Sequence, residues 1–555
     1  MSLSLPARRT APRRTAARTQ PAGRVLLRPL AAMLVGGLLL MAGGCRASSL
    51  PDVPLSSAGA AAPEPSPLPL PAAAEPLHWP APTAAAMDSA APVLWVALAA
   101  QLGPAPGADA AAASPLSLAA ASGALTLIDA RGQRFMAPNL VLHWRREPLA
   151  EPFQLRRHVL GPYASFESAE QAALQWRAQG AAAVIAKPKD WEVWAPTSAP
   201  EPQGELPRLE ERRETQGLVL ELRRAAGTVT LQGPIAIQAP GGLLWKAGTY
   251  AGPFLLQADA YGRWSLVEQV PLERYLEGVV PHEIGAGSPP AALEAQAVLA
   301  RTWAVRNRHR FAVDGYHLCA DTQCQVYSDP RQAGAPVRRA IAVSRHQVLA
   351  TGGQPIHAVY HASNGGVAAG FEEVWSGDPL PYLRPFLDGP APFAARFPLP
   401  LAASALPALL QGGGLAWGGD HPVFRWQRQL SAAQLVAALG AGADRVGTPR
   451  RLVVLERGPS GRVLALAIEG SAGTRVLRLD AIRRTLRQLP STLFTVTPSG
   501  ADRWLVEGGG FGHGAGLSQA GAIDLARRGW SSRQILEHYY PGTALTPLGS
   551  LGGAP

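Results

Sequence analysis

A glycine-rich stretch that encloses a single histidine is the most distinctive feature of this sequence. Residues 508–521 read GGGFGHGAGLSQAG, and His513 lies among the glycines. Ser518 and Gln519 follow, directly before an amphipathic pattern that indicates a helix. Glycine lets a backbone adopt positive φ and approach a ligand closely. The stretch therefore predicts an accessible polar loop, with His513 available to a ligand.

A close pair of cysteines forms a second candidate site. Cys319 and Cys324 are two of the three cysteines in the chain, and His317 precedes them by two residues. In an exported protein such a pair indicates a disulfide or a metal site. Structural zinc takes Cys and His ligands, so Cys319, Cys324 and His317 are candidate zinc ligands. A Cys319–Cys324 disulfide is the alternative, and both remain open. A catalytic zinc site is not expected, because the spacing supplies too few ligands.

The N-terminus is typical of an export signal. Seven arginines and no acidic residue occur in residues 1–28, and an apolar run follows over residues 29–44, directly before Cys45. The residues before Cys45 resemble a bacterial lipoprotein cleavage site. Three outcomes stay open: lipidation at Cys45, a cleaved soluble signal, or an uncleaved membrane anchor. Each predicts a protein of the cell envelope, periplasmic or facing the wall.

Composition limits the class of partner. The 555 residues carry 51 Lys and Arg against 40 Asp and Glu, a formal net charge of +11. This surplus suits an anionic partner such as a cell-wall polymer or a membrane surface. No nucleic-acid-binding module and no long basic block is visible, so nucleic acid is not an expected partner. Residues 46–90 are rich in Ala and Pro, which predicts a linker.

The remaining chain predicts an α+β fold: a mixed α/β catalytic domain with an inserted β-α-β-β-α-β module. Alternating apolar residues indicate strands at 93–100 and 124–135, and helical patterns cover 270–280 and 290–309. The expected units are an export signal (1–45), a linker (46–90), an N-terminal β segment (91–152), the inserted module (153–225), the catalytic domain (226–545) and a tail (546–555).

The inserted module begins with a strand and a capped helix. Ser165 or Ser168 is the expected N-cap and Gly180 the C-cap of this helix, and a second helix is expected over 206–217. The expected order of elements and the stretch GPYASFESAEQAALQWRAQGAAAVIAK resemble a SPOR domain, which implies binding to glycan strands that lack stem peptides. The alternative is an ordinary α/β insertion that only packs against its neighbours.

A series of motifs between residues 124 and 543 resembles the SpoIID/LytB family. The motifs are VEQVPLERYLEGVVPHEIG, LEAQAVLARTWAVRNR, HLCADTQCQVYSD, HASNGG, VWSG, PYLRPF and GGGFGHGAGLSQAGA. The family is named for a sporulation protein that strips peptidoglycan and for an amidase enhancer. Some members bind zinc at the cysteine pair. Its active members are lytic transglycosylases whose catalytic glutamate lies in a Ser-Glu-Met-Pro context. Glu283 matches that glutamate, although its neighbours His282 and Ile284 depart from the pattern.

The resemblance implies that Glu283 protonates the glycosidic oxygen, a step that needs a dry setting such as Val279, Val280 and Ile284 would supply. The muramic acid 6-hydroxyl would then attack C1 and leave a 1,6-anhydro end. The alternative for Glu283 is a solvated position at a helix end. Glu273 and Glu277 are expected to support the helix surface by pairing with Arg274 and Arg301. The expected sugar-binding residues are Tyr327, His361, Ser363, Asn364, His513, Ser518 and Gln519, with Trp375 or Tyr382 stacking on sugar rings.

These patterns predict an envelope peptidoglycan lytic transglycosylase that needs no cofactor for its chemistry and has, at most, a structural zinc. The expected partners are peptide-stripped glycan strands, an amidase and the membrane. One alternative is a non-catalytic wall protein that enhances an N-acetylmuramoyl-L-alanine amidase. A zinc-dependent hydrolase of stem peptides is a second alternative, which the sparse set of ligands disfavours.

Overall fold

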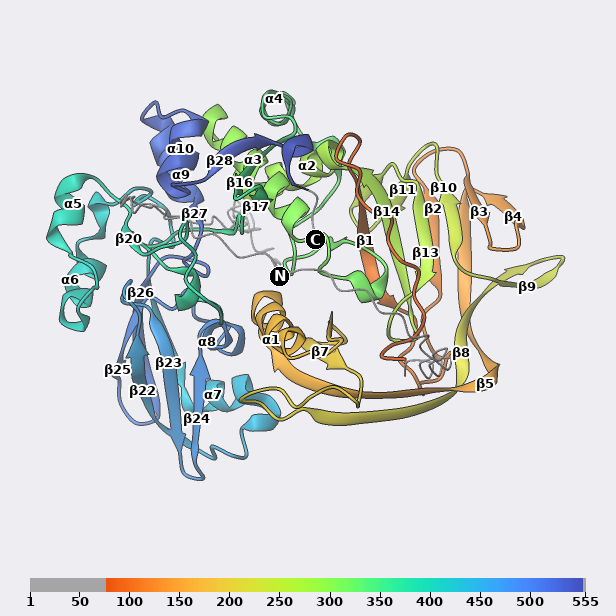
Figure 1. Cartoon of the computed structure of the whole chain (residues 1–555), viewed down its shortest axis with the longest axis horizontal. Helices are drawn as coiled ribbons and strands as arrows, with labels where there is room; N and C mark the ends of the chain where they lie inside the picture. Colours follow the sequence, from red (N-terminus) through yellow and green to blue (C-terminus); the bar gives the residue numbers. More distant parts are fainter. Residues whose placement is uncertain (1–75, 553–555) are drawn as a thin grey trace, which may run out of the picture.

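The computed structural model describes residues 76–552. The export signal, Cys45 and most of the expected linker therefore lie outside the described residues. Within residues 76–552, no helix is both long and apolar enough to cross a bilayer. The elements are arranged as two large sheets, a layer of helices and several small sheets (Figure 1).

The first large sheet has seven strands and carries the N-terminal segment beside the central part of the chain. β1 pairs antiparallel with β14 and parallel with β15, so residues near 95 lie next to residues near 268 and 318. In spatial order the strands are β15 (Leu318–Cys319), β1 (Val93–Leu102), β14 (Trp264–Pro271), β13 (Phe254–Ala258), β10 (Ile235–Gln238), β3 (Leu125–Ile128) and β4 (Arg134–Ala137).

The second large sheet has eight strands and contains the longest strand described. β5 pairs with β8 along almost its whole length, and the two form a long ribbon at the lower edge of Figure 1. The strands are β12 (Gly248–Tyr250), β11 (Leu243–Trp245), β2 (Leu116–Ala120), β5 (Asn139–Tyr163), β7 (Trp191–Ala195), β6 (Val184–Ala186), β8 (Arg208–Arg224) and β9 (Gly227–Leu231).

The prediction of a second helix in the inserted module, over 206–217, is wrong, because residues 208–224 form strand β8. Arg and Glu favour helices only weakly, and a neighbouring strand overrides that preference. β5 supplies this partner, and cross-strand pairs neutralise the charges: Arg156 meets Glu211 at 2.6 Å and Arg157 meets Glu210 at 3.1 Å. The observed order is β-α-β-β-β, which departs from the expected module.

The first helix of that module forms where it is expected. α1 spans Phe166–Ala178, and the Ser165 side chain caps it by accepting the amide hydrogen of Ser168. Gly180 adopts φ +94° just after the helix. The module shares its core with the rest of the protein, since the Trp191 ring lies 5.2 Å from that of Phe311. Residues 153–225 are therefore packed onto the main body.

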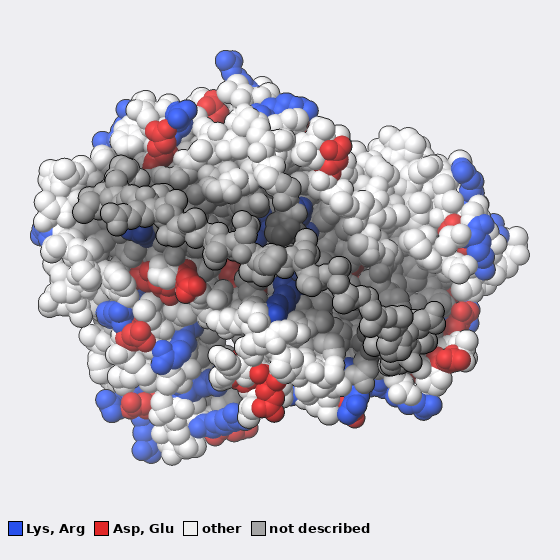
Figure 2. Space-filling view, in the orientation of Figure 1, with Lys and Arg blue, Asp and Glu red and all other residues white. Residues whose placement is uncertain are grey.

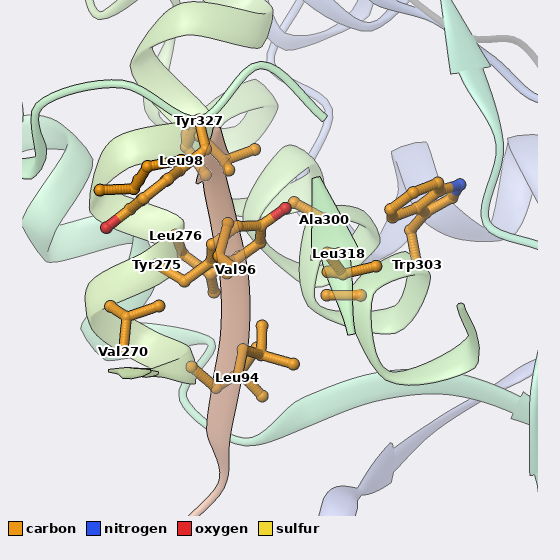
Figure 3. Packing of buried hydrophobic residues seen from close by; sticks show 14 of the residues in the cluster. Leu94, Val96, Leu98, Val270, Tyr275, Leu276, Ala300, Trp303, Leu318 and Tyr327 are labelled. Carbon is orange, nitrogen blue, oxygen red and sulfur yellow. The ribbon is translucent and has the colours of Figure 1, made fainter. Parts of the chain in front are cut away.

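Two helices and a single π-helical turn cover the first sheet and position the site. Leu94, Val96 and Leu98 of β1 face α2 and α3, and Tyr275, Leu276, Ala300 and Trp303 pack nearby (Figure 3). Pro290 begins α3, where its missing amide hydrogen costs nothing. α2 (Leu272–Val280), η1 (Pro281–Gly285) and α3 (Pro290–Arg306) form this cover, and α4 (Ala335–Val343), α9 (Gln519–Arg527) and α10 (Ser532–Tyr539) pack against α3.

The C-terminal half adds small sheets and short helices. Its strands are β16 (Gln347–Thr351), β17 (Gln354–Pro355), β18 (Tyr360–His361), β19 (Val367–Ala368), β20 (Phe386–Leu387), β21 (Arg425–Ser431), β22 (Pro449–Arg457), β23 (Val463–Gly470), β24 (Thr474–Arg478), β25 (Phe494–Pro498), β26 (Arg503–Gly509), β27 (Leu517–Ser518) and β28 (Ala544–Pro547). Its helices are α5 (Ala391–Arg396), α6 (Leu406–Gln411), α7 (Ala432–Leu439) and α8 (Asp480–Thr485). The single helical turns are η2 (Ala312–Asp314), η3 (Pro330–Gln332), η4 (Phe371–Glu373), η5 (Ala403–Ala405), η6 (Gly413–Leu415), η7 (Gly440–Gly442) and η8 (Leu548–Ser550).

Both ends of the described chain pack more closely than a linker and a tail would. Trp79 stacks on Phe153 with ring centroids 4.5 Å apart, and its amide donates to the carbonyl of Ala260. At the other end β28 pairs with β16. Residues 76–92 and 544–552 thus belong to the folded body.

Candidate functional site

Glu283 lies at the turn that follows α2, in the π-helical segment η1. Its side chain is buried, with 2% of the residue exposed, so the solvated alternative does not describe it. Oε1 accepts the backbone amide hydrogen of Val326 at 2.9 Å. Val279, Val280 and Ile284, its apolar neighbours in the chain, are buried as well.

His282 is bonded to α2 and to the turn η3. Its Nδ1 lies 2.9 Å from the carbonyl oxygen of Gly278, and its Nε2 lies 3.0 Å from Oε1 of Gln332. The ring therefore holds the end of α2 against the turn η3. Its departure from the family pattern leaves Glu283 in place.

The residues on both sides of Val326 are anchored. Tyr275 donates to Oε1 of Gln325 at 3.2 Å, and Nε2 of Gln325 donates to the hydroxyl of Tyr360. Tyr327 donates to Oε2 of Glu268 at 2.8 Å, and its ring stacks on Tyr275 at 5.0 Å. The amide that meets Glu283 is thus held from both directions.

Two tyrosines of this group lie within the electrostatic influence of Glu283. Burial, together with the Glu283 carboxylate, raises the pKa of both Tyr275 and Tyr360 well above the usual value. Both phenols therefore stay protonated at neutral pH; the Tyr275 hydroxyl donates to Gln325, and the Tyr360 hydroxyl accepts from it. Tyr360 was not expected from the sequence, where only the adjacent His361 was singled out.

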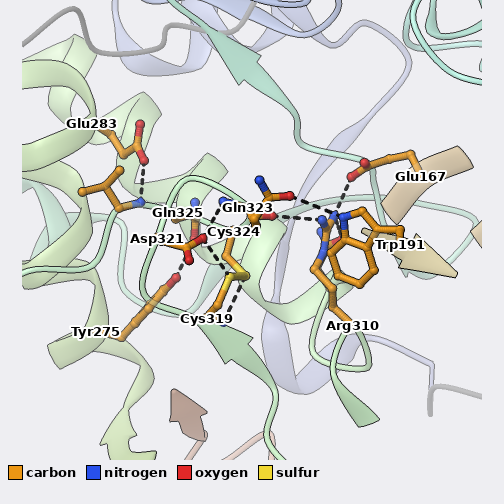
Figure 4. Close-up of a disulfide and its surroundings, with 12 residues drawn as sticks. Glu167, Trp191, Tyr275, Glu283, Arg310, Cys319, Asp321, Gln323, Cys324 and Gln325 are labelled. Atoms are coloured by element: carbon orange, nitrogen blue, oxygen red, sulfur yellow. Dashed lines mark hydrogen bonds and ion pairs between the residues drawn. A yellow bond between two sulfur atoms is a disulfide. The ribbon is translucent and has the colours of Figure 1, made fainter. Parts of the chain in front are cut away.

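Cys319 and Cys324 form a disulfide with Cα atoms 5.7 Å apart. The bridge closes the loop that leads into Gln325 and Val326, and Figure 4 shows this loop between Glu283 and Arg310. On the far side, Arg310 donates to the carbonyl of Gln323 at 3.1 Å. The disulfide thus stabilises the segment that holds Glu283.

The donor set at this pair does not fit zinc. Sulfurs joined to each other offer no thiolate, and Nδ1 of His317 accepts the amide hydrogen of Trp95 at 3.0 Å. Within residues 76–552, no three His, Cys, Asp or Glu side chains are grouped so that they could hold a metal ion. Of the two interpretations from the sequence, the structure has the disulfide.

The glutamates that precede the turn support the helices, as expected. Arg301 is fully buried and binds Glu273 through two hydrogen bonds of 2.9 and 2.6 Å. Arg274 donates to Glu277 at 2.9 Å. The pair Arg301–Glu273 joins α3 to α2, so it fixes the helix that leads into the turn of Glu283.

The glycine-rich loop packs against the strand that carries His361. β18 pairs with β27, and Ser363 exchanges two backbone hydrogen bonds with Phe511. Gly512 has φ +120°, and a Cβ there would lie 2.3 Å from that of His361. This close approach brings the His361 and His513 rings to 4.8 Å from each other. Trp375 packs on His513 at 5.0 Å.

Several of the expected sugar-binding residues form hydrogen bonds within the protein. Asn364 donates to Asp388 at 2.7 Å, Ser518 caps α9 through the Gly521 amide, and Gln519 donates to Gln296 at 3.2 Å. The Ser363 hydroxyl accepts the amide hydrogen of Gly365. All four are buried. Tyr327 is likewise committed to Glu268, and the hydroxyl of the buried Tyr382 to the His357 amide.

Two arginines that the sequence did not single out lie by the histidines. Arg462 packs against Gly514 of the glycine-rich loop, and Arg483 comes from α8. Burial, followed by the charges of Arg483 and Arg462, lowers the pKa of His513 to about 3. Burial, His513 and Arg462 lower the pKa of His361 well below its usual value. Both rings are therefore neutral at pH 7.

Basic and acidic side chains are mixed on one face of the described part of the protein. Figure 2 shows Lys and Arg intermingled with Asp and Glu on the face it presents, without one continuous basic stripe. This distribution suits loose attraction to an anionic polymer more than tight tracking of a nucleic-acid backbone.

Comparisons with known proteins agree with the motifs. The profile of the stage II sporulation protein family matches residues 260–350, which contain Glu283 and the disulfide. A domain of unknown function, DUF8618, matches residues 369–516.

Curated proteins are similar over about half of the chain. Stage II sporulation protein D of Bacillus subtilis (strain 168) is 29% identical over 296 residues, 50% of this chain and 76% of that protein. Stage II sporulation protein D of Bacillus amyloliquefaciens is 29% identical over 303 residues, 51% of this chain and 76% of that protein. The amidase enhancer of Bacillus subtilis (strain 168) is 28% identical over 292 residues, 49% of this chain and 40% of that protein. On the matched profile, these relatives and the motifs around Glu283, the chain belongs to the SpoIID/LytB family.

Proposed function

We propose that this protein is a peptidoglycan lytic transglycosylase of the cell envelope and that Glu283 is its general acid and base. The observation that carries the proposal is the setting of Glu283, buried at the end of α2 with Oε1 held by the Val326 amide. A buried carboxyl group that is fixed by its surroundings suits a proton-transfer role. Membership of the SpoIID/LytB family supports a role at the cell wall.

One carboxyl group is sufficient for this reaction. Glu283 donates its proton to the glycosidic oxygen between MurNAc and GlcNAc as the C1–O bond breaks. The 6-hydroxyl of the same MurNAc then attacks C1, and Glu283 takes the hydroxyl proton. The products are a free GlcNAc hydroxyl and a 1,6-anhydro-MurNAc end, with no water consumed. A hydrolase would instead need a second carboxylate to activate water or attack the sugar.

A second function is favoured by a different observation. The amidase enhancer is similar to 49% of this chain, which supports a role in stimulating an amidase at the wall. Such a role needs glycan or amidase binding without cleavage. Glycan binding by residues 153–225, membrane attachment and contact with an amidase remain predictions from the sequence.

The deciding experiment is mass spectrometry of the soluble products that the purified protein releases from amidase-treated peptidoglycan. Wild type is expected to give anhydro-MurNAc ends, and Glu283→Gln to release them about 10²- to 10⁴-fold more slowly. Glu277→Gln, on the preceding helix α2, is the matched control and should stay active. Reducing ends would mean hydrolysis. No cleavage by folded wild type would favour the amidase-enhancer function.

A further inference from the structure

Four basic side chains meet below the glycine-rich loop, and we refer to Arg462, Arg483, His361 and His513 as the basic cluster. They come from separate elements: Arg462 precedes β23, Arg483 lies on α8, His361 on β18 and His513 in the loop before β27. The two imidazole rings are 4.8 Å apart. A Cβ at Gly514 would lie 2.3 Å from Nε of Arg462, so glycine lets the loop lie directly on the guanidinium.

Arg462 is fully buried, and the charge of Glu373 acts on it without forming an ion pair in the described part of the chain. Its Nη2 donates to the carbonyl oxygens of Asn364 at 3.0 Å and Val367 at 2.9 Å, which are neutral groups. Nε and Nη1 have no hydrogen-bond partner within the described part of the chain. A buried charge of this kind is costly unless an anion meets it. Burial lowers the pKa of Arg462 to about 10, so the group is still charged at neutral pH.

The nearby acids are engaged elsewhere. Glu373 accepts hydrogen bonds from Gly370 and Ser460. Asp480, near Arg483, receives a hydrogen bond from Ser165, and burial raises the pKa of this aspartate to about 6. Neither acid accepts a hydrogen bond from Nε or Nη1 of Arg462, so these buried donors lack an acceptor among the described residues.

His361 adds another buried N–H group that lacks a hydrogen-bond acceptor among the described residues. Its Nδ1 accepts the amide hydrogen of Gly514 at 3.3 Å, so the proton of the neutral ring lies on Nε2. Nε2 has no hydrogen-bond partner among residues 76–552, and 1% of His361 is exposed. Arg483 and His513 are half-buried, so they form the outer side of the cluster while Arg462 and His361 lie behind them.

The cluster adjoins the proposed catalytic group through Tyr360. Nε2 of His513 lies 2.9 Å from the carbonyl oxygen of Tyr360. The phenol of the same residue is bonded to Gln325 and feels the charge of Glu283. Tyr360 thus connects the basic cluster to the surroundings of Glu283.

We propose that the basic cluster binds the free lactyl carboxylate of a MurNAc residue whose stem peptide has been removed. This inference rests on the proposed function. Hydrolysis of the lactyl–peptide amide adds water and leaves a carboxylate on the sugar and an amine on the peptide. Only the stripped sugar then carries a charge at this position. The fork of a guanidinium matches a carboxylate.

The test measures binding separately from cleavage, using the full chain with Glu283→Gln. The probes are two sets of GlcNAc–MurNAc chains of equal length, one with lactyl carboxylates and one with lactyl carboxamides. The carboxylate chains are expected to bind at least about 10-fold more tightly. Adding Arg483→Gln should remove most of this difference. Arg487→Gln, an exposed arginine just after the same helix, is the matched control and should preserve it.

The outcomes separate this inference from the proposed function. Equal affinity for the two chains, or no binding to either, overturns the carboxylate site even if wild type releases anhydro ends. Retained discrimination without cleavage by wild type supports the site and overturns the transglycosylase. If Arg483→Gln does not fold, Arg483→Lys, which keeps the charge but loses the fork, should weaken the preference in part. An unchanged preference in Arg483→Lys and in His513→Gln would overturn the site.

Discussion

Val326 donates its backbone hydrogen to Oε1 of Glu283 over 2.9 Å, from a segment 43 residues later in the chain. A backbone donor has no side-chain torsion of its own, so its position depends on what holds the neighbouring residues. Here these are the Cys319–Cys324 loop before it and Tyr327 after it. The geometry of the proposed acid is therefore set largely by residues that need not touch the substrate.

The disulfide should influence both stability and rate. Closing so short a loop contributes about 2 kcal/mol by restricting the unfolded chain. Replacing Cys319 and Cys324 with serine together should lower the free energy of unfolding by that amount. The rate of glycan cleavage should fall about 10- to 100-fold, because a small displacement of a catalytic group is costly. KM should change little. Urea denaturation and initial rates measure the two effects.

Reduction of the wild-type protein provides the control for the serine variant. The reduced protein should show the same loss as the double variant, and reoxidation should restore it. A variant that cleaves at the wild-type rate with unchanged stability would show that Val326 is held without the bridge.

Tyr327→Phe should separate a positioning role from a substrate contact. The variant keeps the ring stacked on Tyr275 and removes the hydroxyl that binds Glu268 at 2.8 Å. Burial raises the pKa of Glu268, and bonds from Gly252, Tyr327 and Ala251 oppose that effect. Loss of one bond should destabilise the fold by about 1–3 kcal/mol. We expect Tyr327→Phe to lower kcat and to leave KM unchanged.

Tyr163→Phe is the matched control, since its hydroxyl meets Glu205 at the surface. That change should alter stability by no more than about 0.5 kcal/mol. A raised KM for Tyr327→Phe with unchanged kcat would restore the sugar-contact interpretation made from the sequence.

Local patterns predicted the elements whose partners are near in the chain. The sequence contains both end signals of the helix after Ser165, the Ser165 cap and Gly180. In the structure Ser165 caps the helix and Gly180 adopts positive φ just after it. Taken alone, the Arg- and Glu-rich segment 206–217 predicts a helix. Its pairing with β5, which is distant in the chain, makes it a strand. Such pairing overrides a weak local preference.

The residues of the candidate site also fall into two groups: those that a local motif identifies and those whose role depends on distant contacts. Glu283 was identifiable because a motif carries it. Arg462 lies in no such motif. Its candidate role depends on its burial below Gly514 and on its hydrogen bonds to the carbonyls of Asn364 and Val367, which the sequence does not reveal. His361 and Asn364 were grouped as equal sugar ligands, although only His361 keeps an unpartnered nitrogen within the described residues. Hydrogen-bond partners decide between these roles, and a linear pattern does not contain them.

Glu170 links the inserted helix α1 to the main body and should make this contact sensitive to acid. Its carboxylate meets His309 at 2.7 Å and Arg306 at 3.5 Å. Burial alone would raise the pKa of Glu170, but the His309 hydrogen bond and the charge of Arg306 outweigh it and lower that pKa to about 2. A carboxyl group with a lowered folded-state pKa stabilises the fold above its usual value of 4.5, and this contribution is lost as the pH falls towards about 2.

Glu170→Gln should therefore destabilise the protein by on the order of 2–3 kcal/mol at pH 6, and the difference from wild type should shrink between about pH 4.5 and 2. Denaturation curves at each pH, for wild type and variant together, isolate this contribution from the general effect of acid. Glu201→Gln, an exposed position in the loop between β7 and β8, should show no such pH-dependent difference. A gap between wild type and Glu170→Gln that stays constant down to pH 2 would mean that packing of α1, and not the charge of Glu170, joins the insertion to α3.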